Sequence, residues 1–225
     1  MSFVNPIRRI RRRPALLFSI LLIPFAVMWV CGSACDDDKK VTPPEVSDYL
    51  DQSSAVNVLE NLKTAYVKRE YAQYEKLFSA DFIFVFNPAD VDDPINPTPQ
   101  QWARADEMDA TRNLLTHDHV EGISLNWSPG QLTADDTYGW KIRVDDVLLD
   151  VQTRNELGEV WILQVKGATH RFYFREESNL TPAGRKKWVC TRWEDSPIGL
   201  ARSGGSAVRP ETEETSWGAI KGLYR

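Results

Sequence analysis

The spacing of apolar residues predicts helices in the first half of the chain and strands in the second. Apolar positions recur every three or four residues over 53–69, which predicts an amphipathic helix with a serine cap. A short second helix is expected over 70–79, followed by a buried strand over 81–86. The proline- and aspartate-rich stretch 87–99 predicts a loop, and a third helix is expected over 100–115.

From residue 117 onward, apolar and polar residues alternate, which is typical of strands. The expected strands cover residues 123–127, 138–153, 160–175 and 185–195. The alternation changes phase at Asp145–Asp146 and again at Gly167, and each change predicts a β-bulge. Helices followed by long, bent antiparallel strands predict an α+β fold.

The end of the chain falls into two parts with different compositions. Residues 196–214 are rich in Gly, Ser, Pro and charge, which predicts a mobile loop. Residues 216–224 carry several apolar side chains, among them Trp217 and Ile220. This final segment is therefore expected to dock onto the domain.

A targeting signal is predicted at the start of the chain. Five arginines lie within residues 8–13, and residues 15–30 follow as 16 uncharged, mostly apolar positions. A basic segment before a short apolar one is typical of a secretory signal. A membrane-spanning helix needs about 20 apolar residues, and Pro24 interrupts this segment. A signal is therefore expected rather than a permanent span.

The end of the signal indicates how the chain is held after export. Ser33-Ala34-Cys35 resembles the lipobox of bacterial lipoproteins, in which the Cys thiol is acylated, although Gly32 replaces the leucine that the family prefers. A simple cleaved signal and an uncleaved anchor are the alternatives. The expected parts are a signal peptide over 1–34, a tether over 35–48 and one domain over 49–225. The protein would then be an exported, membrane-anchored lipoprotein facing the periplasm or the cell exterior.

Charge and cysteine content exclude some classes of partner and chemistry. The whole chain has a formal net charge of −5. Without residues 1–34 it keeps 22 basic and 32 acidic residues, a net charge of −10, which argues against nucleic acid as a partner. Membrane attachment is therefore expected through lipid rather than through a basic surface. Cys190 is then the one thiol besides Cys35, and it is expected to be buried and inert.

Two segments of the domain resemble the nuclear transport factor 2-like superfamily, which includes the SnoaL-like polyketide cyclases. They are residues 74–82 (YEKLFSADF) and 171–174 (RFYF). The resemblance covers about residues 49–195. It implies three N-terminal helices packed on a strongly curved antiparallel sheet, a cone-like, cystatin-like roll. Members of the superfamily often form dimers, so the resemblance also implies a possible homodimer.

The resemblance points to a pocket inside the cone. The expected lining residues are Trp102, His170, Phe172 and Phe174. Asp81 and Asp109 are candidate carboxylate partners for His170, since some superfamily enzymes pair a pocket histidine with an acid to transfer protons. These three residues are the catalytic candidates. The simpler interpretation is a core histidine with its hydrogen bonds satisfied.

His117 and His119 form the most suggestive candidate metal site. Positions two apart on a strand face the same way, so both imidazoles could reach one ion, with His170 as a third ligand. No Glu or Cys stands at a supporting spacing. Solvated histidines are therefore the preferred interpretation, and no metal or other cofactor is predicted.

The predicted function is a lipid-anchored envelope domain that binds a small apolar ligand or a protein partner without catalysis. One alternative is a lyase or isomerase that uses His170 with a carboxylate. Another is a dimeric interaction module. The surroundings of His170 distinguish the first alternative, and exposed apolar residues on the outer sheet face would favour the second.

Overall fold

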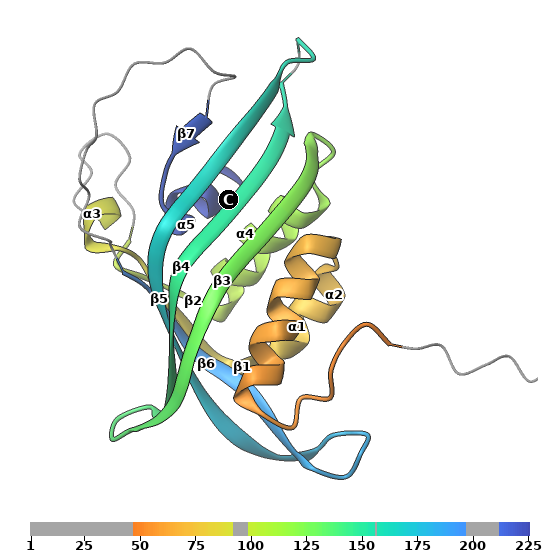
Figure 1. Ribbon diagram of the computed structural model, residues 1–225, viewed down its shortest axis with the longest axis vertical. Helices are drawn as coiled ribbons and strands as arrows, with labels where there is room; N and C mark the ends of the chain where they lie inside the picture. Colours follow the sequence, from red (N-terminus) through yellow and green to blue (C-terminus); the bar gives the residue numbers. More distant parts are fainter. Residues whose placement is uncertain (1–46, 92–98, 156, 197–211) are drawn as a thin grey trace, which may run out of the picture. The chain divides into compact units, whose positions relative to one another are not determined.

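The computed structural model describes residues 47–91, 99–155, 157–196 and 212–225 (Figure 1). Residues 45–225 form one compact unit, close to the predicted domain of 49–225. The predicted signal, Cys35 and most of the tether lie outside the described residues, as does most of the predicted loop over 196–214. Within the described part of the chain, no helix combines the length and the apolar character that a membrane crossing requires.

The first two predicted helices begin and end close to the observed positions, and the described part of the chain adds short helices that were not predicted. The described helices are α1 (Ala55–Lys68), α2 (Tyr71–Tyr74), the 3₁₀ helix η1 (Glu75–Leu77), α3 (Pro88–Val91), α4 (Arg104–Thr116) and α5 (Trp217–Leu223). Ser54 caps α1 by accepting a hydrogen bond from the backbone N–H of Asn57 at 3.1 Å. Arg69 ends the helix in the left-handed conformation at φ 57°. Its guanidinium donates to the carbonyl of Leu115, which ties the end of α1 to that of α4.

Seven described strands form one sheet. They are β1 (Phe78–Val85), β2 (Gln101–Ala103), β3 (Val120–Asp135), β4 (Gly139–Arg154), β5 (Val160–Leu180), β6 (Lys186–Ser196) and β7 (Thr212–Glu214). Their order is β2-β1-β6-β5-β4-β3, and β7 pairs with β5 beyond this path. The long strands β3 to β6 pair antiparallel, which confirms the predicted α+β class with a curved antiparallel sheet. The pairs β1–β6 and β5–β7 are parallel.

Several boundaries differ from the sequence prediction. The strand predicted over 123–127 covers Val120–Asp135, and the one predicted over 160–175 continues to Leu180. Three further segments form a different type of element from the one predicted. The third helix begins at Arg104 instead of residue 100, because Gln101–Ala103 pair with β1 as a strand and bury Trp102. The short helix α3 lies within the predicted loop 87–99. Residues 212–214, predicted as loop, form β7. In each case pairing or packing with a distant segment overrides the local sequence preference.

Both predicted bulges are confirmed. The register of β4 against β5 shifts between Val144 and Val147, and Asp146 there has a φ of 53°. Gly167 has a φ of 68° at a second register shift, between the pairs of Val147 and Leu148. Bulges bend a strand and increase its twist. The two irregularities therefore lie where β4 and β5 must curve around the core.

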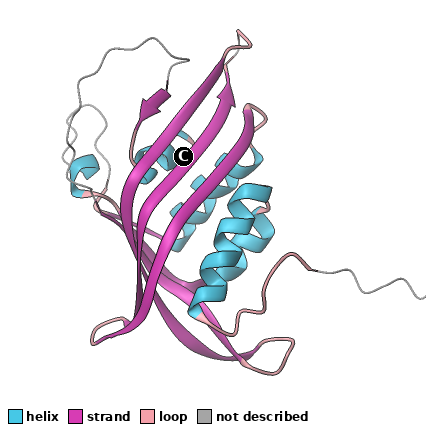
Figure 2. Cartoon of the chain, viewed as in Figure 1, coloured by secondary structure: helices cyan, strands magenta, loops and turns pink. Residues whose placement is uncertain are grey.

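The helices pack on one face of the curved sheet (Figure 2). Helices α1 and α4 contact this inner face, and α5 lies against α4. The core between these layers is strongly aromatic, with rings packed edge to face. Its largest fully buried side chains include Trp193, Trp217, Tyr66, Tyr74, Phe82, Phe84, Phe86, Phe172, Phe174 and Lys221. The one charged side chain among them, Lys221, directs attention to α5.

Candidate functional site

Residues 216–224 dock onto the domain, as their apolar side chains predicted. The structure adds that they form the helix α5, whose Trp217 packs on Trp193 of the sheet. Ser216 caps the helix by accepting from the N–H of Ala219 at 2.9 Å, and the same hydroxyl donates to Asp90 at 2.5 Å. Trp217 is fully buried. At Gly218 an added Cβ would lie 2.5 Å from Cδ1 of Phe86, so this position has no room for a side chain. The close approach lets the helix backbone reach the core.

A buried ion pair joins α5 to α4. Lys221 Nζ lies 2.5 Å from Glu107 Oε1, and both side chains have 0% exposure. The ammonium group also lies 4.1 Å from the ring centroids of both Phe84 and Trp193. Such positions over aromatic faces stabilise a desolvated cation. Burial lowers the pKa of Lys221, while the adjacent Glu107 carboxylate acts in the opposite direction.

The Glu107 carboxylate collects further donors. Its Oε1 accepts from the hydroxyl of Tyr74 at 2.5 Å and from that of Thr111 at 3.0 Å. Burial and the Glu107 charge together raise the pKa of Tyr74 well above its ordinary value, so this hydroxyl remains a donor. Among the described residues, Oε2 of Glu107 has no hydrogen-bond partner. The cluster fixes α2, α4 and α5 to one another.

His170 belongs to a second polar group beside the first. Its Nδ1 accepts from the indole N–H of Trp193 at 3.1 Å and lies 3.4 Å from Oδ1 of Asp195. Oδ2 of Asp195 accepts from the backbone N–H of Gly218 at 3.2 Å. Nε2 of His170 has no partner within the described part of the chain. The histidine is therefore held from one side only.

The protonation states of this pair follow from burial. Desolvation, helped by the charge of Lys221, lowers the pKa of His170 to about 3. Desolvation raises the pKa of Asp195 to about 6, against the opposing effects of the Gly218 N–H and Lys221. At neutral pH the imidazole is uncharged. Asp195 becomes protonated, and so uncharged as well, as the pH falls through about 6.

Single variants should reveal opposite pH dependences in this pair. The pKa of His170 is depressed, so the stability that its neutral form contributes is present above pH 6.5 and is lost as the pH falls toward 3. The pKa of Asp195 is raised, so the stability that its protonated form contributes is present below about pH 4 and is lost as the pH rises through 6. Between pH 4 and 6 the two slopes oppose each other. Relative to wild type, D195N should lose stability as pH falls from 6 to 4, and H170Q should gain it. Each difference is expected to be about 1 kcal/mol per pH unit.

Urea unfolding at pH 4, 5, 6 and 7 measures these differences. K186M, which alters an exposed ion pair with Glu176, is the control and should follow the wild-type pH profile. Parallel profiles for wild type, D195N and H170Q would show that neither group changes its protonation on folding in this range.

The structure does not bring the predicted acids to His170. Asp81 binds Arg175 through two hydrogen bonds of 2.7 and 2.8 Å, and its side chain is 63% exposed. Asp109 pairs with Arg112 and is 69% exposed. The hypothesis that either acid partners His170 is therefore wrong in this structure. The carboxylate beside His170 is Asp195.

Three of the four predicted pocket residues lie side by side on β5, and all four are buried. His170, Phe172 and Phe174 follow one another on the inner face of β5, and all three are fully buried. Trp102 lies on β2 and is 2% exposed. Trp217 of α5 packs against His170 with ring centroids 5.4 Å apart. Side chains of the chain itself therefore fill the space around these residues.

The remaining candidates, His117, His119 and Cys190, have surroundings typical of residues that stabilise the fold. His117 and His119 stack edge to face at 5.3 Å, and the His117 ring also packs on Tyr224. Within the described ranges, no group of three or more His, Cys, Asp or Glu residues could hold a metal ion. Cys190 is fully buried, and burial raises the pKa of its thiol, as expected of an inert cysteine.

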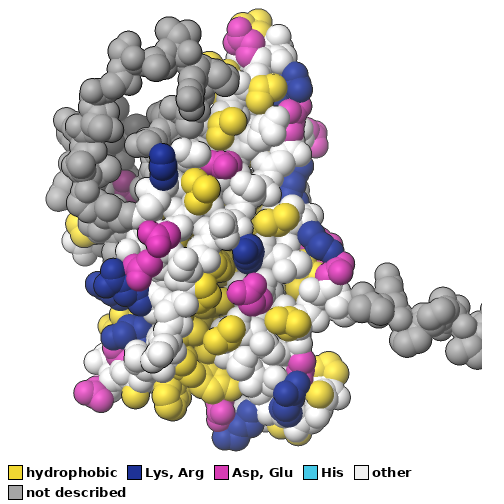
Figure 3. All heavy atoms as spheres, in the orientation of Figure 1, with side chains coloured by type: hydrophobic (Ala, Val, Ile, Leu, Met, Phe, Trp, Pro, Cys, Tyr) yellow, Lys and Arg dark blue, Asp and Glu magenta, His cyan; other side chains and the backbone are white. Residues whose placement is uncertain are grey.

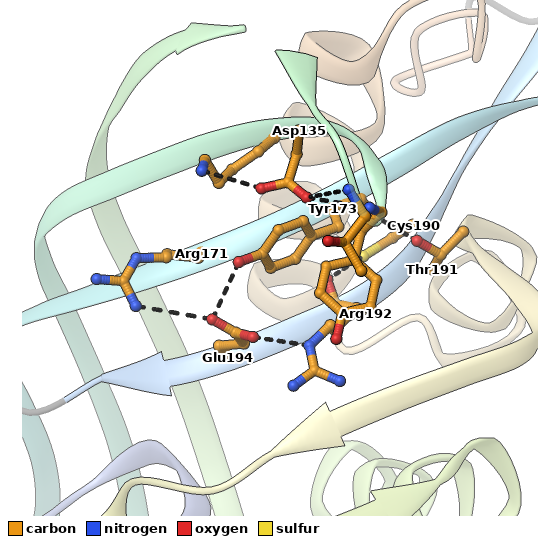
Figure 4. A network of polar contacts seen from close by, with 10 residues as sticks. Asp135, Arg171, Tyr173, Cys190, Thr191, Arg192 and Glu194 are labelled. Atoms are coloured by element: carbon orange, nitrogen blue, oxygen red, sulfur yellow. Dashed lines mark hydrogen bonds and ion pairs between the residues drawn. The ribbon is translucent and has the colours of Figure 1, made fainter. Parts of the chain in front are cut away.

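The outer face of the sheet carries paired charges (Figure 4). Glu194 accepts from the hydroxyl of Tyr173 at 3.1 Å and from Arg192 at 2.7 Å, and Arg171 lies 3.7 Å away. Burial and the Glu194 charge raise the pKa of Tyr173 to about 12. Acidic and basic side chains are interspersed over the face seen in Figure 3. The homodimer stays a prediction.

An open pocket of about 400 Å³ lies elsewhere, at the base of α1. One wall is the segment 47–52 that leads into α1. Residues 73–77 and the hairpin at 180–187 form the others. No sequence pattern identified this pocket, because three segments far apart in the chain form it.

Sequence reasoning also missed Glu107, Asp195 and Lys221. The sequence pattern did not single out any of them, since a charged side chain is rarely buried. One signal was present in the sequence: Lys221 lies four residues after Trp217 and so shares its helix face. Because Trp217 indicates that this face of α5 is buried, a lysine on the same face would be expected to have a buried carboxylate as its partner.

Comparison with known proteins gives similarities of fold at low identity. No protein-family model matches the chain, and no curated protein matches it significantly. The solved structures that resemble it include a provisionally assigned aromatic ring hydroxylase from Novosphingobium aromaticivorans, with 10% identity, a TM-score of 0.45, and coverage of 64% of this chain and 87% of that one. An NTF2-like protein of unknown function in nutrient uptake from Rhodospirillum rubrum has 14% identity, a TM-score of 0.39, and coverage of 64% and 98%.

A provisionally assigned SnoaL-like polyketide cyclase from Shewanella denitrificans has 11% identity, a TM-score of 0.41, and coverage of 63% of this chain and 88% of that one. Two of these three descriptions name the superfamily that the sequence resembles. At this level of similarity, an activity for this chain must be argued from its own residues.

Proposed function

We propose that this protein is a lipid-anchored domain of the cell envelope that binds a small molecule without transforming it. The anchor rests on the arginine-rich, apolar start of the chain and on Ser33-Ala34-Cys35. The binding role rests on the open pocket at the base of α1, whose volume of about 400 Å³ falls within the range of small-molecule sites.

The observation that most favours binding over catalysis is that the groups around His170 are packed inside the core. A general base must come within hydrogen-bond reach of the proton that it removes. His170 is fully buried, and Trp217 and Trp193 pack against its ring. Asp195 is engaged by Gly218 of α5. A substrate could meet this pair only after α5 left the core.

Several independent contacts hold α5 in place, which argues against the lyase or isomerase alternative. They are the Lys221–Glu107 ion pair, the Gly218–Asp195 hydrogen bond, and a hydrogen bond of 2.8 Å from the Asn113 amide to the carbonyl of Tyr224. In addition, the indole of Trp217 is fully buried. Opening the site would break these contacts together, so a catalytic role for His170 has little support in this arrangement.

Mass spectrometry of the mature protein, extracted from membranes with a mild detergent, tests both halves of the proposal. Denaturing spectra should show acyl mass on Cys35, because stable attachment takes two or more acyl chains. Native spectra should show an additional small molecule that denaturation releases. C35S should lose the acyl mass and leave the membrane fraction, whereas the matched control C31S should keep both. An unacylated wild type refutes the anchor, and native spectra without added mass refute the binding role.

A further inference from the structure

The pocket at the base of α1 has fixed walls. Asn61 holds the backbone of Leu50 from both sides, accepting from its N–H and donating to its carbonyl, each at 2.7 Å. The Asn57 amide donates to the carbonyl of Asp51 at 2.7 Å. The backbone N–H of Trp188 donates to the carbonyl of Gln52, also at 2.7 Å. The segment 50–52 is therefore tied to α1 on one side and β6 on the other, which makes the site preformed.

The opposite wall is the turn between β5 and β6. Thr181 N–H donates to the carbonyl of Arg185 at 2.7 Å, and Gly184 takes a φ of 73° to close this turn. Asp51 reaches across the pocket to accept from Arg185 at 2.7 Å and from the Thr181 hydroxyl at 3.1 Å. This contact joins the two walls and neutralises the carboxylate that lines the pocket.

Apolar side chains form much of the lining. Leu77 lies at the back and is buried, while Leu50 and Leu180 are 50% and 62% exposed at the opening. Both leucines therefore leave apolar surface available to a ligand in the pocket. The lining thus fits a ligand with an apolar body.

The lining also has an excess of positive charge. Lys76 and Lys187 both line the pocket. Among the described residues, neither lysine has a carboxylate partner; the ammonium of Lys76 donates to the amide of Gln73 at 3.2 Å. The one carboxylate in the lining, that of Asp51, is already paired with Arg185. The pocket therefore offers two cations to a ligand and no carboxylate without a cationic partner.

We propose that this pocket binds a small amphiphile that has an apolar body and one acidic group, a carboxylate or a phosphate. The leucines contact the body, and Lys76 and Lys187 bind the acid. This inference rests on the proposed binding function and adds the site and the chemical class of the ligand. A chain-like acid released from a membrane and a water-soluble aromatic acid share this chemistry.

Isothermal titration of residues 45–225, which form a compact unit with their own core, tests the proposal. The probes are decanoate, decyl phosphate, phenylacetate and the uncharged decanol. Decanoate and decyl phosphate should bind more tightly than decanol by about tenfold, and raising the salt concentration should reduce this preference. Tighter binding of decanoate than of phenylacetate indicates a chain-like ligand, and the reverse indicates an aromatic one. Equal affinities for decanoate and decanol would overturn the proposal that the ligand has an acidic group.

Variants locate the site. K76Q and K187Q should each weaken decanoate binding about threefold, and the double variant about tenfold, with decanol binding unchanged. The matched control K166Q, an exposed lysine on β5 away from the pocket, should bind decanoate as wild type does. Thermal unfolding confirms that each variant is folded. If no probe binds, the inference fails, while a molecule retained by the protein extracted from cells would leave the proposed function standing.

Discussion

Replacing Lys221 by methionine is expected to destabilise the domain by about 3–5 kcal/mol, because the change leaves the buried Glu107 carboxylate without its cation. Methionine is close to lysine in length and suits the aromatic surroundings of Phe84 and Trp193, so packing is largely kept. The loss measured by urea unfolding therefore reports the uncompensated charge. A double variant, K221M with E107Q, should recover part of the loss, since no charge then remains buried.

The same substitution at the surface provides the control. Lys186 pairs with Glu176 at 2.7 Å, but both side chains are well exposed. K186M should therefore cost less than about 1 kcal/mol. Equal effects of K221M and K186M would contradict a desolvated pair at Lys221.

Replacing Trp217 by alanine should cost about 3–5 kcal/mol, the range for removing a large aromatic side chain from a packed core. The indole is fully buried and packs at ring distances of 5.1 Å on Tyr66 and 4.9 Å on Trp193. Its loss should also release α5, since this side chain joins the helix to both of these rings. Urea unfolding measures the first effect, and amide hydrogen exchange across residues 216–224 measures the second.

W140A is the matched control for this variant. Trp140 lies on the same face of the sheet, beyond the helices, and is 42% exposed. Its replacement should cost clearly less than that of Trp217 and should leave hydrogen exchange in α5 unchanged. If W217A unfolds like wild type, α5 is not part of the cooperative core, and access to His170 becomes possible.

Local signals in the sequence were sufficient for much of the fold. The apolar stripe of α1 and its serine cap act within a few residues, so they could be identified from spacing alone. The phase changes at Asp145–Asp146 and Gly167 marked both bulges, because the two-residue period of a strand cannot change face without one. Residues 101–103 could not be assigned in this way, since their strand depends on pairing with β1.

The candidate site depended on longer-range contacts. The sequence identified His170 as an inward-facing residue on an apolar strand. It did not identify Asp195 as its neighbour, because that contact requires the register that places β6 beside β5. Asp81 and Asp109 were plausible from position alone, yet both bind arginines at the surface, where a carboxylate stays solvated.

The sequence by itself determined the class of the fold, the order of its longer helices and strands, the bends of two long strands and the docking of its last segment, because periodicity and turn chemistry act over short distances. It also supports the prediction of an exported lipoprotein. Only the tertiary structure decided that α5 fills the core, that Lys221 and Glu107 are buried as a pair, and that segments around residues 50, 76 and 187 meet in one pocket. These features depend on which distant segments come together, and that choice is made by the packing of the whole domain.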